Sequence, residues 1–226
     1  MVEIPYKPQD PDSIKLLFTR IARNYDLTNH VISFGLDVLW RKKFVRLFDN
    51  YRKIVDVCCG SGAFLPLIKG RIAAGLDFTH AMLQVAAEKN PGVPLVEGDA
   101  QKIPFASDRF DAAVIVYSIR NIPDVRACLK ELHRILQPGG RLGILDFGVP
   151  EGKVMNALYR LYFTKLMPVI GSWVAGDPSS YHYFVKSVMD FPKRDAFVDL
   201  IREAGFKNAR YEQYTLGAAL CYIAEK

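Results

Sequence analysis

Glycine and acidic residues stand at the ends of three apolar segments in the first half of the chain. A Gly-Ser-Gly loop, 60–62, follows the apolar run 53–57, and glycine lets a backbone turn tightly and approach a ligand closely. Asp77 ends the next apolar run, where a carboxylate can accept hydrogen bonds from both hydroxyls of a ribose. Asp99 follows the third run, and a carboxylate there can accept a hydrogen bond from the amino group of adenine. These residue types, in this order, indicate a nucleotide-like ligand.

Each of these features also has a purely structural explanation. The glycine loop could serve any sharp turn from a strand into a helix, and it lacks the third glycine of the GxGxxG dinucleotide pattern, which Leu65 replaces. Asp77 could instead cap the helix that follows it. Three such features at successive strand ends, all on one edge of a sheet, are less easily explained by turns alone. We therefore expect these strand ends to hold one cofactor.

Strand and helix patterns alternate through the middle of the chain and would position these residues. The expected strands are 53–57, 72–76, 94–97, 110–116 and 141–146, the last after a turn at Pro138-Gly139-Gly140. The expected helices between them are 63–68, 79–90 and 125–136. This alternation predicts a parallel sheet with helices on both faces.

The two ends of the chain add further helices and a hairpin. The other expected helices are 13–25, capped by Ser13, then 37–48, 153–167, 179–190 and 193–204. Two last strands, 208–216 and 218–224, would form an antiparallel hairpin about Gly217. We therefore expect one α/β domain over 1–226, built on a Rossmann-like, doubly wound, mostly parallel seven-stranded sheet. N-terminal helices (about 13–50) and a helical, lid-like insertion (about 149–190) would elaborate it.

Composition narrows the classes of function. The 226 residues are 50% hydrophobic and 24% charged, with a net charge of +6, which is ordinary for a globular domain. The chain has no Lys/Arg-rich run and no RNA-binding motif, so nucleic acid is not an expected partner. Its four cysteines form no CxxC pair, so we expect no metal and a reducing compartment. The polar start and the charges within 154–175 indicate a cytoplasmic protein, with peripheral membrane contact left open.

Longer segments resemble a known family. The ordered segments VDVCCGSG, GLDFTHAML, EGDAQKIPF, DRFDAAVIVYSIRNIPD and LHRILQPGGRLGILDF resemble the class I S-adenosylmethionine-dependent methyltransferases. The segment YDLTNHVIS from Tyr25 and the pair Arg120-Asn121 are similar, more narrowly, to the quinone-biosynthesis C-methyltransferases of the UbiE/MenG type. The resemblance covers nearly the whole chain, from about Phe18 to its end. Thr28 and Asp146 are among the positions that depart from that family's pattern.

This resemblance implies S-adenosylmethionine as the cofactor. The cofactor-binding residues that it implies are Gly60, Ser61, Gly62, Asp77, Phe78, Asp99, Ala100, Val116 and Tyr117. Among them, Val116 and Tyr117 would flank the methionine end of the cofactor. Their expected place agrees with the general rule that ligands of open α/β sheets lie beyond the carboxyl ends of the strands.

The reaction implied by the resemblance is C-methylation of a prenylated hydroquinone in menaquinone or ubiquinone biosynthesis, with a demethylmenaquinol-type acceptor favoured. A hydroquinone becomes a carbon nucleophile when a hydroxyl loses its proton, so the protein must align the ring and stabilise the phenolate. Arg120 is the expected oxyanion partner, and Asn121 and Tyr25 would orient the hydroxyl or a water. Aromatic and apolar residues of the insertion would hold the prenyl tail, namely Tyr159, Tyr162, Phe163, Met167, Trp173 and Phe184.

Several alternatives stay open at this point. The acceptor could be another small aromatic or lipidic molecule, or the chain could bind the cofactor without catalysis. A nucleic-acid methyltransferase fits less well, because the sequence shows no polar motif for a flipped base. Arg120 could form a surface ion pair, Tyr25 could serve helix packing, and His182 could be structural or a base. A homodimer is also left open.

Overall fold

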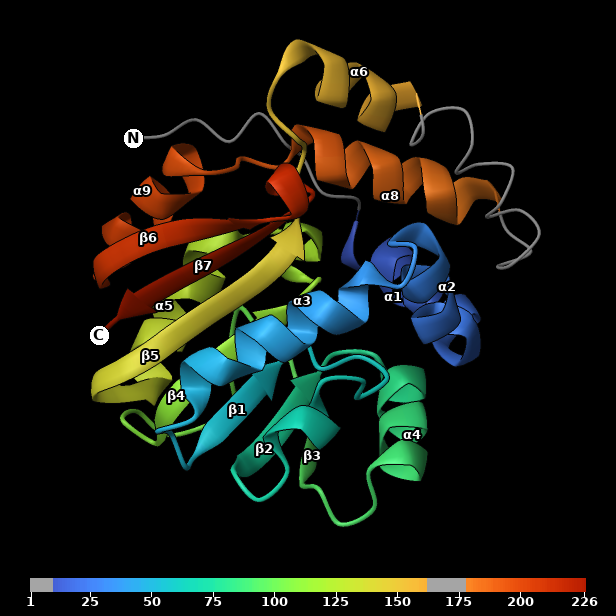
Figure 1. The fold of residues 1–226 in the computed structure, drawn as a ribbon. Helices are drawn as coiled ribbons and strands as arrows, with labels where there is room; N and C mark the ends of the chain where they lie inside the picture. Colours follow the sequence, from blue (N-terminus) through green and yellow to red (C-terminus); the bar gives the residue numbers. More distant parts are fainter. Residues whose placement is uncertain (1–9, 162–177) are drawn as a thin grey trace.

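A seven-stranded sheet forms the centre of the structure, a computed structural model that describes residues 10–161 and 178–226. Its strand order is β3-β2-β1-β4-β5-β7-β6 (Figure 1). The strands are β1 (Ile54–Val57), β2 (Ile72–Asp77), β3 (Leu95–Glu97), β4 (Phe110–Val116), β5 (Leu136–Phe147), β6 (Lys207–Tyr214) and β7 (Ala219–Glu225). The first five are parallel, and β7 is antiparallel to its neighbours β5 and β6. The predicted fold class is confirmed.

Helices cover both faces of this sheet and its carboxyl edge (Figure 1). The α-helices of the described residues are α1 (Pro11–Ile21), α2 (Tyr25–Ile32), α3 (Leu36–Val45), α4 (His80–Lys89), α5 (Val125–Ile135), α6 (Lys153–Leu161), α8 (Pro178–Asp190) and α9 (Asp195–Glu203). Short 3₁₀ turns include η1 (Ala22–Asn24), η2 (Arg46–Phe48), η3 (Leu65–Ile68), η4 (Ile119–Asn121) and η6 (Thr215–Gly217). Helices α1, α2 and α8 lie beyond the carboxyl ends of the parallel strands.

Strand β4 shows why the middle strands are apolar throughout. Successive side chains of a strand point to opposite faces of its sheet. Ala113 and Ile115 belong to the core cluster that includes α5 and α9, whereas Ala112 and Val114 belong to the cluster beneath α3. Because both faces are buried, the strand reads as a continuous apolar run rather than as an alternating one.

The first predicted helix is wrong in two respects. It starts at Pro11 rather than Ser13, and the carboxylate of Asp10 caps it by accepting a hydrogen bond from the backbone N–H of Ser13 at 3.2 Å. Proline is well suited to the first turn, since its missing N–H would have no helical partner there. The predicted helix 13–25 is also interrupted by η1, so that Tyr25 begins a helix of its own, α2. The sequence carries no glycine or proline at this break.

Other boundaries also differ from the predicted ones. The predicted helix 63–68 is only the 3₁₀ turn η3, because Pro66 lacks the N–H that a longer helix needs. The predicted turn 138–140 lies inside β5, where the register with β4 shifts. The final hairpin closes through η6 rather than at Gly217 alone.

Part of the predicted lid-like insertion falls outside the described residues. Helix α6 (Lys153–Leu161) covers the described part of the predicted helix 153–167. Four of the residues expected to hold a prenyl tail lie outside the described residues: Tyr162, Phe163, Met167 and Trp173. The side chain of His182 is not described either. Within residues 10–161 and 178–226, no helix is long and apolar enough to cross a membrane.

Candidate active site

Three hollows meet at the carboxyl edge of the sheet. The surface of the first is mostly apolar, with the carboxylates of Asp77 and Asp99 in its lining, a combination that is usual for small-molecule sites. Five predicted cofactor residues line it, together with side chains of α1 and α4: Gly60, Asp77, Phe78, Asp99 and Ala100. The structure therefore brings together the ends of β1, β2 and β3 as the sequence predicted.

The loop after β1 depends on its glycines. Gly60 and Gly62 have φ angles of +55° and +75°, a region that glycine adopts without a steric penalty. A Cβ atom at Gly62 would stand 2.5 Å from Nδ2 of Asn90, and the same amide donates to the carbonyl of Gly62 at 3.2 Å. This tight contact holds the loop against the end of α4.

Asp77 joins the loop to the next helix. One carboxylate oxygen accepts from the backbone N–H of Gly60 at 2.8 Å and the other from the N–H of Thr79 at 2.9 Å. Burial raises the pKa of Asp77, and these two N–H groups oppose that rise. Helix α4 begins at His80 without a side-chain cap hydrogen bond, so the helix cap considered for Asp77 is wrong; Asp77 instead orders the turn before α4 and lines the first hollow. Each carboxylate oxygen retains a second lone pair for a ligand.

The second hollow, of about 460 Å³, is mostly apolar. It lies between α1, α2, η4 and α8, and its lining includes Phe18, Ile21, Ile32, Arg120 and Phe184. Phe184 is therefore where the sequence placed it, on a groove that suits an apolar molecule. Tyr159 packs instead against the core cluster beneath α3.

A smaller third hollow contains a buried carboxylate that the sequence analysis did not select. Asp56 of β1 lines it, and neither of its carboxylate oxygens has a hydrogen-bond partner among the described residues. Burial raises the pKa of Asp56 well above its ordinary value, and the negative charge of Asp77 adds to this. A buried carboxylate without partners favours a cationic ligand or a bound proton. Its signal in the sequence was an acidic residue in the middle of an apolar strand.

Three of the four remaining predicted cofactor residues lie on this third hollow, whereas Gly62 lines none of the three hollows. Ser61, Val116 and Tyr117 line it, and the hydroxyl of Ser61 donates to a carboxylate oxygen of Asp26 at 2.5 Å. Tyr117 and Cys58, which also lines this hollow, both have positive φ angles although neither is glycine. Such strained backbone persists only where the surroundings enforce it, and it is concentrated at functional sites.

Tyr25 lines all three hollows. Asn121 is shared by the first and the second, while Cys58 and Ser118 are shared by the first and the third. Burial raises the pKa of the Tyr25 hydroxyl, and the positive charge of Arg120 opposes that rise. The tyrosine that begins α2 therefore stands where the three spaces join.

Arg120 is buried, so the surface ion pair considered for it is wrong. Its guanidinium donates to Oδ1 of Asp146 at 2.5 Å, to the carbonyl of Tyr117 at 2.7 Å and to the hydroxyl of Ser187 at 3.2 Å. It also lies 4.9 Å from the ring centre of Phe184. Arg120 thus connects η4 to β5 and α8 while lining the second hollow.

Asn121 has a defined orientation beside Arg120. Its side-chain oxygen accepts a hydrogen bond from the hydroxyl of Tyr183 at 3.0 Å. Because that oxygen is engaged, the amide group is held in place next to Tyr25, where the first and second hollows adjoin. The three predicted catalytic residues therefore lie around one space, although their roles there stay predictions.

Sequence comparison finds similar proteins along nearly the whole chain. A family model described as the ubiE/COQ5 methyltransferase family matches residues 7–226. A demethylmenaquinone methyltransferase of Corynebacterium kroppenstedtii is 34% identical over 220 residues, which cover 96% of this chain and 95% of that protein. One of Chlorobaculum parvum is 35% identical over 223 residues, which cover 95% of this chain and 92% of that protein.

Structure comparison agrees on the fold. A SAM-dependent methyltransferase of Thermotoga maritima matches with a TM-score of 0.70 at 24% identity, covering 93% of this chain and 98% of that chain. Phosphoethanolamine N-methyltransferase 2 of Haemonchus contortus, solved in complex with S-adenosyl-L-methionine, matches with a TM-score of 0.60 at 15% identity, covering 82% of this chain and 52% of that chain. The sheet is that of the class I methyltransferases.

We expect Asp56 to release a proton when S-adenosylmethionine binds. Burial raises its pKa in the free protein, and a nearby ligand cation would lower it. At pH values between the pKa of Asp56 in the complex and its higher pKa in the free protein, the carboxyl loses its proton when the cofactor binds. Cofactor affinity should therefore rise with pH over this range. Calorimetry in buffers of different ionisation enthalpy measures the release.

Asp56→Asn is the matched control, since it keeps the shape but cannot ionise. It should bind the cofactor roughly tenfold or more weakly, because a hydrogen bond to a charged group is worth about 1.5–3 kcal/mol. It should also gain stability relative to the wild type as pH rises, because the wild type loses stability between the ordinary pKa of a carboxyl in the unfolded chain and the raised pKa of Asp56 in the folded protein. Equal proton release by both proteins would exclude Asp56 from the site.

Proposed function

The chain belongs to the ubiE/COQ5 methyltransferase family, and on this premise we propose that it transfers a methyl group to a ring carbon of a prenylated hydroquinone. It is an S-adenosylmethionine-dependent methyltransferase. A demethylmenaquinol-type acceptor is favoured, because the relatives that match nearly the whole chain are named demethylmenaquinone methyltransferases. The observation that carries the proposal is the position of Tyr25 where a hollow lined by the carboxylates of Asp77 and Asp99 adjoins one lined by Arg120.

The residues of the first and third hollows fit the cofactor. Asp77 would accept the ribose hydroxyls with its free lone pairs, and Asp99 would accept the amino group of adenine. Asp56, without a partner among the described residues, would pair with the ammonium group of the methionine end. When bound, S-adenosylmethionine supplies a methyl group on a positively charged sulfur, which needs no further activation by the protein.

The second hollow would hold the acceptor. Its apolar walls exclude water, and the hydroxyl of Tyr25 and the amide of Asn121 would orient the acceptor oxygen between them. The charge of Arg120 favours the phenolate over the phenol and so lowers the pKa of the acceptor. Because Arg120 is already paired with Asp146, it would act mainly through this local potential, as a fixed charge that does not reorganise during the reaction.

A panel of acceptors tests the proposal directly. Purified protein, labelled S-adenosylmethionine and reduced quinols would be combined, and products identified by mass spectrometry. We expect ring C-methylation of a prenylated demethylmenaquinol, with slower turnover of benzoquinols. Methylation at oxygen or nitrogen, or turnover of non-prenylated aromatic acceptors alone, would replace this function with that of a methyltransferase for another small acceptor.

Replacing Tyr25 by phenylalanine should slow turnover more than it weakens cofactor binding. Tyr25→Phe removes one hydroxyl and leaves the ring that lines all three hollows. Loss of one donor to a developing oxyanion typically costs about 10²–10³ in rate. Steady-state kinetics should therefore show a reduced kcat, with the affinity measured by calorimetry nearly unchanged. A variant with normal kcat would mean that Tyr25 serves only to pack α2.

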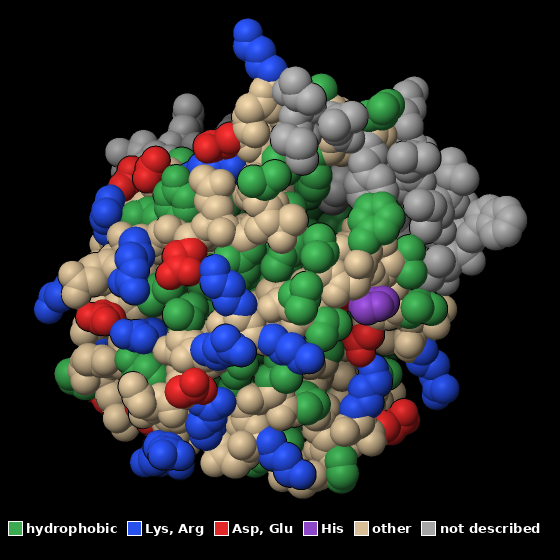
Figure 2. All heavy atoms as spheres, in the orientation of Figure 1, with side chains coloured by type: hydrophobic (Ala, Val, Ile, Leu, Met, Phe, Trp, Pro, Cys, Tyr) green, Lys and Arg blue, Asp and Glu red, His purple; other side chains and the backbone are tan. Residues whose placement is uncertain are grey.

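We also propose that the corner between α2 and α3 docks on an anionic bilayer, where a prenylated acceptor resides. Three large apolar side chains are exposed there: Leu27 by 55%, Phe34 by 72% and Leu39 by 60%. Exposed basic residues follow, among them Lys42 on α3 and Arg46 at the start of η2. Figure 2 shows Lys and Arg side chains over α3 and hydrophobic ones toward the corner. Apolar and basic side chains together suit the surface of an anionic membrane.

Vesicle sedimentation checks this docking surface. Phe34→Glu should reduce binding to phosphatidylglycerol vesicles severalfold, because it replaces an inserting ring by a repelled charge. Leu161→Glu is the matched control, since Leu161 is an exposed leucine on α6 (54%) outside the corner. Equal binding of the two variants, or binding independent of lipid charge, would refute the assignment.

A further inference from the structure

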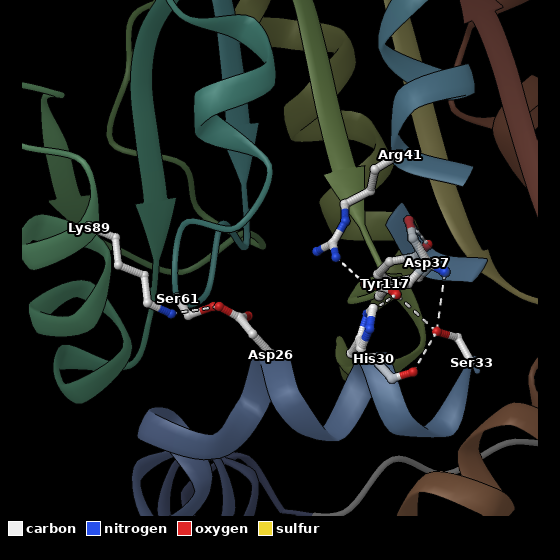
Figure 3. Close-up of polar contacts among 8 residues, drawn as sticks. All are labelled: Asp26, His30, Ser33, Asp37, Arg41, Ser61, Lys89 and Tyr117. Carbon is white, nitrogen blue, oxygen red and sulfur yellow. Dashed lines mark hydrogen bonds and ion pairs between the residues drawn. The ribbon is translucent and has the colours of Figure 1, made fainter. Parts of the chain in front are cut away.

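Asp26 joins three elements that surround the cofactor hollows (Figure 3). It is the second residue of α2. One carboxylate oxygen accepts from the hydroxyl of Ser61, in the glycine loop, at 2.5 Å. The other accepts from the ammonium of Lys89, at the end of α4, at 2.6 Å. The residue before Asp26 is Tyr25, the side chain on which the three hollows converge.

The two contacts of Asp26 differ in expected strength. The side chains of Lys89 and Asp26 are 43% and 30% exposed, and exposed ion pairs contribute little. Ser61, by contrast, is 1% exposed, and a hydrogen bond from a buried hydroxyl to a charged acceptor is among the stronger kinds. The bond between Ser61 and Asp26 is therefore the principal connection between α2 and the glycine loop.

The opposite end of α2 is held separately (Figure 3). His30 and Ser33 contact Oδ1 of the buried Asp37 at 3.1 and 3.0 Å. Arg41 pairs with the other oxygen of Asp37, and the hydroxyl of Tyr117 donates to the Asp37 carbonyl at 3.4 Å. The carboxyl end of α2 is thus fixed to α3 and to the end of β4. Its amino end, with Tyr25, is connected to the cofactor loop through Asp26.

We propose that Asp26 is a positioning residue that couples the cofactor loop to the acceptor site. The proposal rests on the function proposed above. Gly60 lines the first hollow and Ser61 the third, so a ligand there restrains the loop that carries both. Through Ser61 and Asp26 this restraint reaches the first turn of α2 and places Tyr25 over the acceptor hollow. Ser61 is then the donor that transmits this restraint, a role different from the cofactor contact predicted from the sequence.

Hydrogen exchange tests the coupling without any acceptor. In the wild type, S-adenosylhomocysteine should slow amide exchange in α2 (Tyr25–Ile32) as well as in the first turn of α4. In Asp26→Ala the ligand should still slow exchange in α4 as in the wild type, yet slow exchange in α2 severalfold less, because only the direct contact with Tyr25 remains. If Asp26 has a purely structural role, amide exchange in α2 should be faster in the variant than in the wild type, but the ligand should slow it by the same factor in both proteins. That result would overturn the proposal.

Kinetics provide the second readout. Asp26→Ala should lower kcat/KM for the quinol by roughly ten- to hundredfold, the range expected for one hydrogen bond to a charged group. Affinity for S-adenosylmethionine should stay within about threefold of the wild type. Asp26→Asn should recover most of the loss, because an amide oxygen still accepts from Ser61.

Paired variants make the test specific. Ser61→Ala should match Asp26→Ala, and the double variant should be no worse than either single one, because both remove the same bond. Lys89→Met should have little effect. Asp49→Ala is the matched control, since it removes another carboxylate of the N-terminal segment from an exposed ion pair, with Arg71. Additive losses for Asp26 and Ser61, or no recovery in Asp26→Asn, would overturn the proposal.

These measurements separate the two proposals. If the wild-type protein methylates no quinol, the proposed function fails, while the exchange experiment still decides whether Asp26 couples the loop to α2. If quinols are methylated and Asp26→Ala turns them over normally, the function stands and the role of Asp26 falls.

Discussion

The ion pair between Arg120 and Asp146 is the contact on which the acceptor side of the molecule depends. Both side chains are almost fully buried, and burial raises the pKa of Asp146 while the charge of Arg120 opposes that rise. Removing one member of such a pair typically costs about 3–5 kcal/mol, because the other charge is left buried without a partner. Arg120 also binds Ser187, so the pair fixes α8 over the carboxyl edge of the sheet and fixes one wall of the second hollow.

The cofactor side follows from a different constraint, the geometry of a parallel sheet. The carboxyl ends of β1 and β2 lie side by side, which brings Asp56 and Asp77 close enough for each to influence the electrostatics of the site. Burial disfavours the charged form of both carboxyls, and the negative charge of Asp77 disfavours it further at Asp56. A positively charged ligand would stabilise the charged forms of both carboxylates. The fold therefore pre-forms a site whose carboxylates are stabilised by a cation.

The sequence predicted the sheet and its cofactor edge because those features are local. Apolar runs mark strands, and Asp77 and Asp99 follow them directly. The partners of Arg120 and Ser61 could not be found in this way, since Asp146 and Asp26 lie 26 and 35 residues away along the chain and only folding brings them together. The start of α2 at Tyr25 was missed because η1 interrupts the helix without glycine or proline. Asp56 was passed over although an acidic residue within an apolar strand is a signal, because its lack of a partner among the described residues appears only in the folded structure.

Charge then distinguishes the spaces that meet at Tyr25. Acidic side chains line the first and third hollows, and the third also contains Arg41, whose charge is paired with Asp37. The second contains the guanidinium of Arg120 among apolar walls. A cationic methyl donor is favoured beside the carboxylates, and an acceptor that develops negative charge is favoured beside Arg120. Because Asp146 balances much of that positive charge, Arg120 can remain buried in the free protein without a bound anion. The same ion pair that fixes α8 thus lets the second hollow remain apolar while keeping a positive charge in its wall, which is the combination that the proposed acceptor requires.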